Sequence, residues 1–242
     1  MCGLWPAQRR PAQGPKAAHE LIHIGMGYTP SYMNFLIRVP LQTTGEQHAR
    51  LCALRVVFAQ VCNELAPHVQ QSRVWNRVAL HHLHYRALRS RFPALGSQMV
   101  CNAIYAVSKM ARLIYQHPQS PFNPVHKPAA VLPLLRFADS CPVYFDRHTL
   151  SIKPGQLSLF TMDGRMRFDV TLAGGQMALF EQAKLREIVL NERADQVFEL
   201  SFHLDSADVA ALPEGDAPVV TSSEAEQPSG LIPEYVSVEV AP

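Results

Sequence analysis

The chain has 242 residues, a formal net charge of +2 and an apolar share of 48%, enough for one large domain or two small ones. It contains no run of about 18 apolar residues, so no membrane span is predicted. The five cysteines are widely spaced and form no C-x-x-C pair, which excludes a zinc ribbon or disulfide framework and favours a reducing cytoplasm. Residues 1–32 have no secretory pattern and are predicted to be a flexible leader.

Charge is unevenly divided along the chain. Residues 46–117 carry nine basic residues against two acids, Glu46 and Glu64, whereas residues 205–242 carry eight acids and no Lys or Arg. A basic helical body indicates a polyanion partner, most often nucleic acid. The alternative is a solvated helix surface beside a disordered tail. Charge alone does not decide between these two interpretations.

The chain begins its predicted structure with a strand and a helix. Residues 33–42 are assigned to the strand, because apolar positions alternate along them. Thr43 or Thr44 is available to cap the following helix, and Pro67 is expected to end it or to lie just past its end. Apolar residues at a spacing of three and four predict its buried face: Leu51, Leu54, Phe58, Val61 and Leu65.

Two more helices complete a helical segment over residues 43–117. The second is expected from about Arg73 to Arg91, and the third from about Ser97 to Tyr115. The second helix shows one apolar face: Trp75, Ala79, Leu83 and Ala87. The third shows another: Val100, Ile104, Val107, Ala111 and Ile114. Residues 118–133 are rich in proline and are predicted to be an irregular linker.

Short strands are predicted over residues 134–204. The candidates are Leu134 to Phe137, Val143 to Phe145, Thr149 to Ile152, Gln156 to Thr161, Arg165 to Leu172 and Gln196 to Leu204. Asp163-Gly164 indicates a hairpin, and a short helix or loop is expected near Gln182 to Asn191. Residues 205–232 are predicted to be an acidic linker or tail, and residues 233–242 a terminal strand.

This order of elements predicts an α+β fold. A first strand standing alone would leave its edge groups unpaired. We therefore expect residues 33–42 to pair with the strands of residues 134–204 in one small antiparallel β-barrel. The helical segment would then be an insertion after the first strand.

Several short motifs, taken in order, resemble the OrfB/TnpB-type transposon proteins and the related type V CRISPR effectors over about residues 33–204. They include Val39-Pro40-Leu41, Cys62-Asn63, Tyr85-Arg86-Ala87-Leu88-Arg89, Ser97-Gln98, Phe145-Asp146-Arg147, Leu157-Ser158-Leu159 and Gly164-Arg165. The resemblance implies that the barrel is a wedge domain and the helical insertion a recognition lobe. In that family this half binds a guide RNA, the guide–target heteroduplex and a short flanking motif in the target DNA duplex.

The sequence departs from the family where the RuvC-like nuclease half would begin. The family's first nuclease strand reads Gly-Val-Asp-x-Gly, whereas this chain has Ser237-Val238-Glu239-Val240-Ala241. Glu239 is a candidate counterpart of the first catalytic Asp, and chance similarity is an equal alternative. One carboxylate does not assemble a paired-metal site. The resemblance thus implies a nuclease-deficient protein without catalytic residues, metal or cofactor, acting by binding or with a separate nuclease or effector chain.

Candidate binding residues follow from this interpretation. Dispersed cations suit backbone phosphates, and the candidates are Arg73, Arg77, Arg86, Arg89, Lys109, Arg112, Arg136, Arg147 and Arg165. By resemblance, bases or the flanking motif would be read by Asn76, Ser97, Gln98, Cys101 and Asn102. The alternatives are solvated helix faces for the cations, and capping or surface hydrogen bonds for the polar set.

Other side chains are interpreted as structural. His81, His82 and His84 have no acid or cysteine nearby in sequence, so a metal site is not expected there. Cys52 and Cys62 are expected to be buried thiols, and no nucleophile motif occurs. A second class of function, a protein–protein adaptor whose basic helices dock an acidic protein, stays open.

Overall fold

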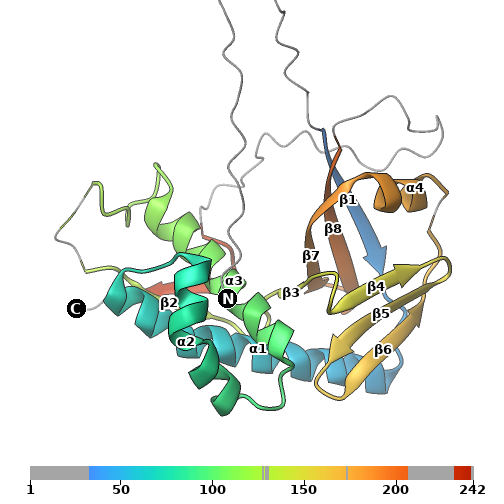
Figure 1. Ribbon diagram of the computed structural model, residues 1–242, viewed down its shortest axis with the longest axis horizontal. Coiled ribbons are helices and arrows are strands. Elements are labelled where there is room, and N and C mark those ends of the chain that lie inside the picture. Colours follow the sequence, from blue (N-terminus) through green and yellow to red (C-terminus); the bar gives the residue numbers. More distant parts are fainter. Residues whose placement is uncertain (1–32, 127, 129–130, 173, 207–231, 241–242) are drawn as a thin grey trace, which may run out of the picture. The chain divides into compact units, whose positions relative to one another are not determined.

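The structure is a computed structural model (Figure 1) that describes residues 33–126, 128, 131–172, 174–206 and 232–240. This part of the chain contains four helices and three antiparallel sheets, so the predicted α+β class is confirmed. None of the described sheets closes into a barrel. The leader, residues 1–32, and residues 207–231 of the predicted acidic linker lie outside the described residues.

The largest sheet joins the first described strand to three strands from the second half of the chain. Strand β1 (Met33–Pro40) pairs with β8 (Phe198–Ser206), β8 pairs with β7 (Lys184–Glu192), and β7 pairs with β3 (Val143–Phe145). The expected pairing of the first strand with a later one is thus confirmed. Alternate residues of β1 face the core and are at most 4% exposed: Phe35, Ile37 and Val39.

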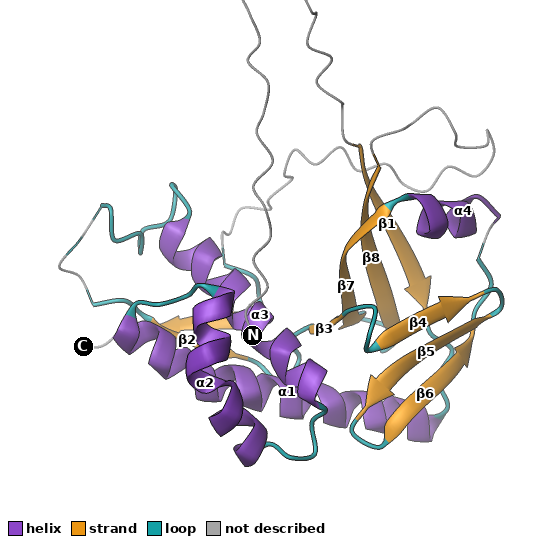
Figure 2. Ribbon diagram, viewed as in Figure 1, coloured by secondary structure: helices purple, strands orange, loops and turns teal. Residues whose placement is uncertain are grey.

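Two smaller sheets account for the remaining strands (Figure 2). Strands β4 (Leu150–Lys153), β5 (Gln156–Thr161) and β6 (Gly164–Asp169) form an antiparallel meander, and β2 (Leu134–Phe137) pairs with β9 (Val236–Glu239) in a separate two-stranded sheet. The predicted hairpin at Asp163-Gly164 and the predicted terminal strand are both present. These separate pairings explain why the described strands do not form one closed barrel.

Helix α1 (Gly45–Ser72) begins at a capping box. Thr44 Oγ1 accepts from Gln47 N (3.2 Å), and Gln47 Oε1 accepts from Thr44 N (3.0 Å). All residues of its predicted apolar stripe are buried. The expected end at Pro67 is wrong, because the helix continues to Ser72. Burial of Ala66 and Val69 on either side of Pro67 stabilises this last turn despite the missing N–H.

Helix α2 (Arg77–Arg91) starts four residues later than expected, because Asn76 is its N-cap. The predicted apolar face is also wrong: Leu80 and Leu88 are the buried residues, and Leu83 is 63% exposed. Few residues of this helix reach the core, so its periodicity was a weak guide to its packing.

Helix α3 (Ser97–Gln116) matches the prediction, and every residue of its expected inward face is buried. Helix α4 (Gly174–Gln182) was not predicted, and β7 replaces the helix or loop expected at residues 182–191. No described helix is long and apolar enough to cross a bilayer.

Candidate nucleic-acid interface

Predicted site residues from the helical segment and from the strand segment meet at one open hollow. Its volume is about 400 Å³, and its lining includes Arg77, Gln98 and Arg147. Arg77 is the first residue of α2, Gln98 lies in the first turn of α3, and Arg147 follows β3. Candidates that are 21 to 70 positions apart in the sequence therefore share one surface.

The turn that carries Arg147 is held by Asp146. Asp146 Oδ1 accepts from the backbone N of His148 and Thr149, each at 3.0 Å, and Gln98 Nε2 donates to Asp146 Oδ2 at 2.5 Å. This contact links the start of α3 to the end of β3. The donors to the Asp146 carboxylate are neutral groups, so it still offsets part of the positive charge in the hollow.

A second hollow of about 460 Å³ adjoins the first, because Arg186 and Glu187 of β7 line both. Tyr105 and Lys109 of α3 contribute to its wall. Both Lys109 Nζ (2.7 Å) and Tyr105 Oη (2.7 Å) donate to the Glu187 carboxylate. Burial, with this hydrogen bond next, raises the pKa of Tyr105, so its hydroxyl stays protonated.

The two hollows differ in the charge left unpaired. Arg186 contacts Asp205, and Glu187 is taken by Lys109, so these four charges cancel. Arg77 instead lies over the ring of Tyr105, with Cζ 5.2 Å from the ring centroid. Among the described ion pairs none involves Arg77 or Arg147. The remaining positive charge of the first hollow therefore comes from these two residues.

Three other predicted phosphate ligands are exposed or half-exposed without an ion pair in the described part of the chain. Arg86 is exposed on α2, Arg112 donates to Ser108 Oγ (3.1 Å), and Arg165 donates to Ser158 Oγ (3.1 Å) and His148 O (3.0 Å). Arg73 Nη1 donates to Pro128 O (3.1 Å). These cations do not line the hollow that holds Arg77 and Arg147.

The remaining candidates are engaged within the protein. Lys109 pairs with Glu187, and Arg136 of β2 pairs with Glu239 of β9 at 3.0 Å. Arg89 donates to the backbone O of Phe92 and of Leu95, which caps the end of α2. These contacts give the three side chains a structural role in this conformation.

The polar set predicted to read bases is also mostly engaged. Asn76 Oδ1 accepts from the backbone N of Val78 (2.9 Å) and Ala79 (3.2 Å), so the capping alternative describes it. Asn102 is 4% exposed and donates to Tyr144 O (3.0 Å), which places it in the core rather than at a surface. Ser97 is exposed and has no such contact among the described residues; Cys101 is half-buried, and burial raises its pKa.

The histidines of α2 contact other rings. His81 stacks on Tyr85, and His84 stacks on His68 of α1, each with centroids 4.6 Å apart. Burial, and next the neighbouring His68, lower the pKa of His84. The His84–His68 pair therefore packs α2 against α1, whereas His81 and Tyr85 stack within α2.

Sequence reasoning missed Tyr105 and Arg186 as wall residues. Arg186 lies in a segment that was expected to be a helix or loop, so its place in the wall of the hollow was not predicted. Reasoning by sequence proximity also missed a group formed by His48, Cys52 and Glu192, because Glu192 lies 140 positions beyond Cys52. Cys52 is half-buried rather than buried.

A scan against protein-family models and a search of curated proteins find no match to this sequence.

Proposed function

We propose that this chain is a nuclease-deficient, RNA-guided nucleic-acid-binding protein that binds a structured guide RNA and, with it, a target DNA duplex. The observation that carries the proposal is the open hollow lined by Arg77, Gln98 and Arg147. Guide RNA and heteroduplex are recognised mainly through their phosphates, and Arg77 and Arg147 supply positive charge there from two segments of the fold.

The composition of the hollow favours a nucleic acid over an acidic protein. The central part of a protein–protein interface is depleted of charged residues and enriched in apolar ones. Seven of the ten residues that line this hollow are instead polar or charged, among them Arg77, Arg147 and Asp146. A planar guanidinium beside an aromatic ring, as in the Arg77–Tyr105 pair, also suits contact with phosphate and bases.

The connectivity supports the finer interpretation of the fold. The chain leaves β1, passes through α1, α2 and α3, and then returns to the sheet in which it began, first at β3 and later at β7 and β8. We propose that these helices are the counterpart of a recognition lobe and that the three antiparallel sheets together are the counterpart of a wedge domain. A protein with this division would place nucleic acid against both parts.

Action by binding, alone or with a separate nuclease or effector chain, fits the setting of Glu239. This carboxylate, the candidate counterpart of a catalytic acid, pairs with Arg136 across β2 and β9. A carboxylate that would hold a metal ion needs acidic neighbours rather than a guanidinium. The geometry of Glu239 therefore favours a structural role.

Fluorescence anisotropy over a series of salt concentrations tests the proposal. The probes are an RNA hairpin, a DNA duplex and an RNA–DNA heteroduplex, each labelled at one end. We expect Arg77→Ala with Arg147→Ala to weaken binding of the RNA-containing probes and to lower the slope of log K against log salt by about 2, or about 1 per phosphate contact.

A matched double variant controls for the change in net charge. Lys153→Ala with Arg193→Ala also removes two exposed cations, and neither residue lines the hollow. This variant should keep the wild-type slope. Equal losses of RNA binding in the two double variants would contradict a site at the hollow. If the wild-type protein bound none of the three probes, nucleic-acid binding itself would be contradicted. Tighter binding to an acidic polypeptide than to the probes would favour the adaptor.

A further inference from the structure

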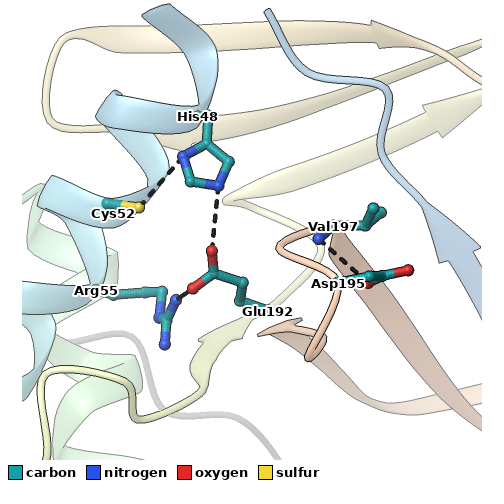
Figure 3. Close-up of polar contacts among 6 residues, drawn as sticks. All are labelled: His48, Cys52, Arg55, Glu192, Asp195 and Val197. Carbon is teal, nitrogen blue, oxygen red and sulfur yellow. Dashed lines mark hydrogen bonds and ion pairs between the residues drawn. The ribbon is translucent and has the colours of Figure 1, made fainter. Parts of the chain in front are cut away.

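A second site of different chemistry lies at the start of α1. His48 and Cys52 are one helical turn apart, and Glu192, the last residue of β7, faces them (Figure 3). Cys52 Sγ is 3.6 Å from His48 Nδ1, and His48 Nε2 is 3.1 Å from Glu192 Oε1. One imidazole therefore contacts a thiol with one nitrogen and a carboxylate with the other.

The donor set and its spacing fit a zinc-type cation. Thiolate, imidazole and carboxylate bind Zn²⁺ at about 2.3, 2.0 and 2.0–2.2 Å. Two ligands at about 2.3 and 2.0 Å on a tetrahedral ion are about 3.5 Å apart, which is close to the observed 3.6 Å between Sγ and Nδ1. One ligand atom from each residue can be chosen so that all lie within 4.8 Å of one another.

Neighbouring groups hold two of these side chains in place. Arg55, which is 6% exposed, donates to Glu192 Oε2 and so leaves Oε1 on the side of His48. The ring of His48 packs against the ring of Phe198, with centroids 5.0 Å apart, and Arg55 Cζ lies 5.6 Å from the centroid of the Phe198 ring. Outer contacts of this kind orient metal ligands.

We propose that Cys52, His48 and Glu192 form a binding site for a divalent, zinc-type cation that ties α1 to the end of β7. Cys52 Sγ, one ring nitrogen of His48 and one carboxylate oxygen of Glu192, which lie within 4.8 Å of one another, would hold the ion. Binding takes the proton of the Cys52 thiol, which is released to solvent, so one proton leaves for each ion bound. Three protein ligands leave the fourth position to water.

This site is separate from the proposed nucleic-acid function, because none of its three ligands lines either hollow. Co²⁺ provides a direct probe, since a cobalt–thiolate bond gives a charge-transfer band in the near ultraviolet. We expect titration of the metal-free full-length protein with Co²⁺ to produce this band with one ion per chain, and Zn²⁺ to displace it.

Cys52→Ser is expected to abolish the band, and His48→Gln to weaken Co²⁺ binding by about 10-fold or more, as loss of metal-site partners does. Cys101→Ser is the matched control, because Cys101 is also half-buried on a helix but has no place in the cluster. It should keep the wild-type band. Circular dichroism of each variant without metal checks that it folds.

Alkylation gives a second readout that does not depend on the variants. With Zn²⁺ present, iodoacetamide should modify Cys101 of the wild-type protein at an unchanged rate and Cys52 at a much lower one. A band that survives Cys52→Ser, a band lost in Cys101→Ser, or equal alkylation of Cys52 with and without Zn²⁺ would each overturn the proposal.

Discussion

Helices α1 and α2 both carry arginines, but their charges have different surroundings. In α1, Arg55 is buried against Glu192, and Arg50 donates to Thr161 Oγ1 (3.1 Å) and Asp163 O (3.3 Å). In α2, Arg77 meets an aromatic ring at the edge of a hollow, and Arg86 is exposed. The first helix uses these two cations to hold the fold, whereas the second presents Arg77 and Arg86 at a surface and engages only Arg89 and Arg91 in contacts within the protein.

This difference follows from how much of each helix is buried. Most turns of α1 contribute side chains to the core, so a cation on its inner side must find a partner. Only Leu80 and Leu88 of α2 are buried, so its polar residues keep their solvation. Basic residues in a sequence therefore indicate a polyanion site only where the helix that carries them is largely exposed.

The largest expected effect is on the free energy of unfolding, which should fall much more on truncation of a side chain in α1 than in α2. Phe58→Ala removes a fully buried ring of α1, and we expect it to lower the free energy of unfolding by about 3–5 kcal/mol. Leu83→Ala, on the exposed side of α2, should change it by at most about 0.5 kcal/mol. Urea unfolding followed by circular dichroism measures both, and similar losses would contradict the assigned difference in burial.

The next effect concerns the buried charge of α1. Glu192→Gln leaves the guanidinium of Arg55 buried without its counterion, so we expect a loss of about 3 kcal/mol. Glu239→Gln breaks an ion pair whose side chains are 44% and 56% exposed, and should cost less than about 1 kcal/mol. Equal costs in urea unfolding would show that Arg55 is not buried as described.

A smaller effect compares the two arginine populations in binding. Arg77→Ala should lower the salt slope of RNA binding by about 1. Arg50→Ala removes the same charge, but the Arg50 side chain is held by the β5–β6 hairpin. The salt slope of RNA binding by this variant should therefore stay at the wild-type value. If anisotropy titrations found the same change of slope for both variants, the arginines of α1 and α2 would not differ in their contribution to RNA binding.

The smallest effect is a pH dependence where α1 and α2 touch. Burial and His68 lower the pKa of His84, so the folded chain binds this proton less readily than the unfolded chain, whose histidine titrates near about 6.5. The contribution of His84 to the free energy of unfolding is therefore fully present above about pH 6.5 and is lost as the pH falls through the lowered pKa.

His84→Gln should therefore reduce the loss of unfolding free energy between about pH 7 and pH 5. His82→Gln, on the exposed side of the same helix, is the control and should follow the wild type. If the free energy of unfolding of His84→Gln depended on pH as that of the wild type does, this pH dependence could not be assigned to His84.

Sequence patterns predicted the well-buried elements closely. The stripes of α1 and α3 and the alternation in β1 were confirmed, because each element has one face in the core and its periodicity records that face. Thr43 and Thr44 were both offered as the cap of α1, and the structure has Thr44, because capping depends on neighbours in sequence. Local chemistry was sufficient in these segments.

Prediction failed where distant contacts decide the outcome. The charged stretch that became β7 carries good helix formers, yet pairing with β8 and β3 makes it a strand. Pro67 stays inside a helix for a similar reason, since the packing around it outweighs the local preference. Of the candidate site, the sequence identified Arg77, Gln98 and Arg147 but not that they meet at one hollow.

The most direct test of nucleic-acid binding at this hollow is to purify wild-type protein and the Arg77→Ala, Arg147→Ala variant from cells, wash both at high salt, and sequence the RNA that stays bound. The account predicts one enriched structured RNA with a variable end on the wild-type protein, and its depletion on the variant. No RNA, or the same bulk ribosomal fragments on both, would contradict it.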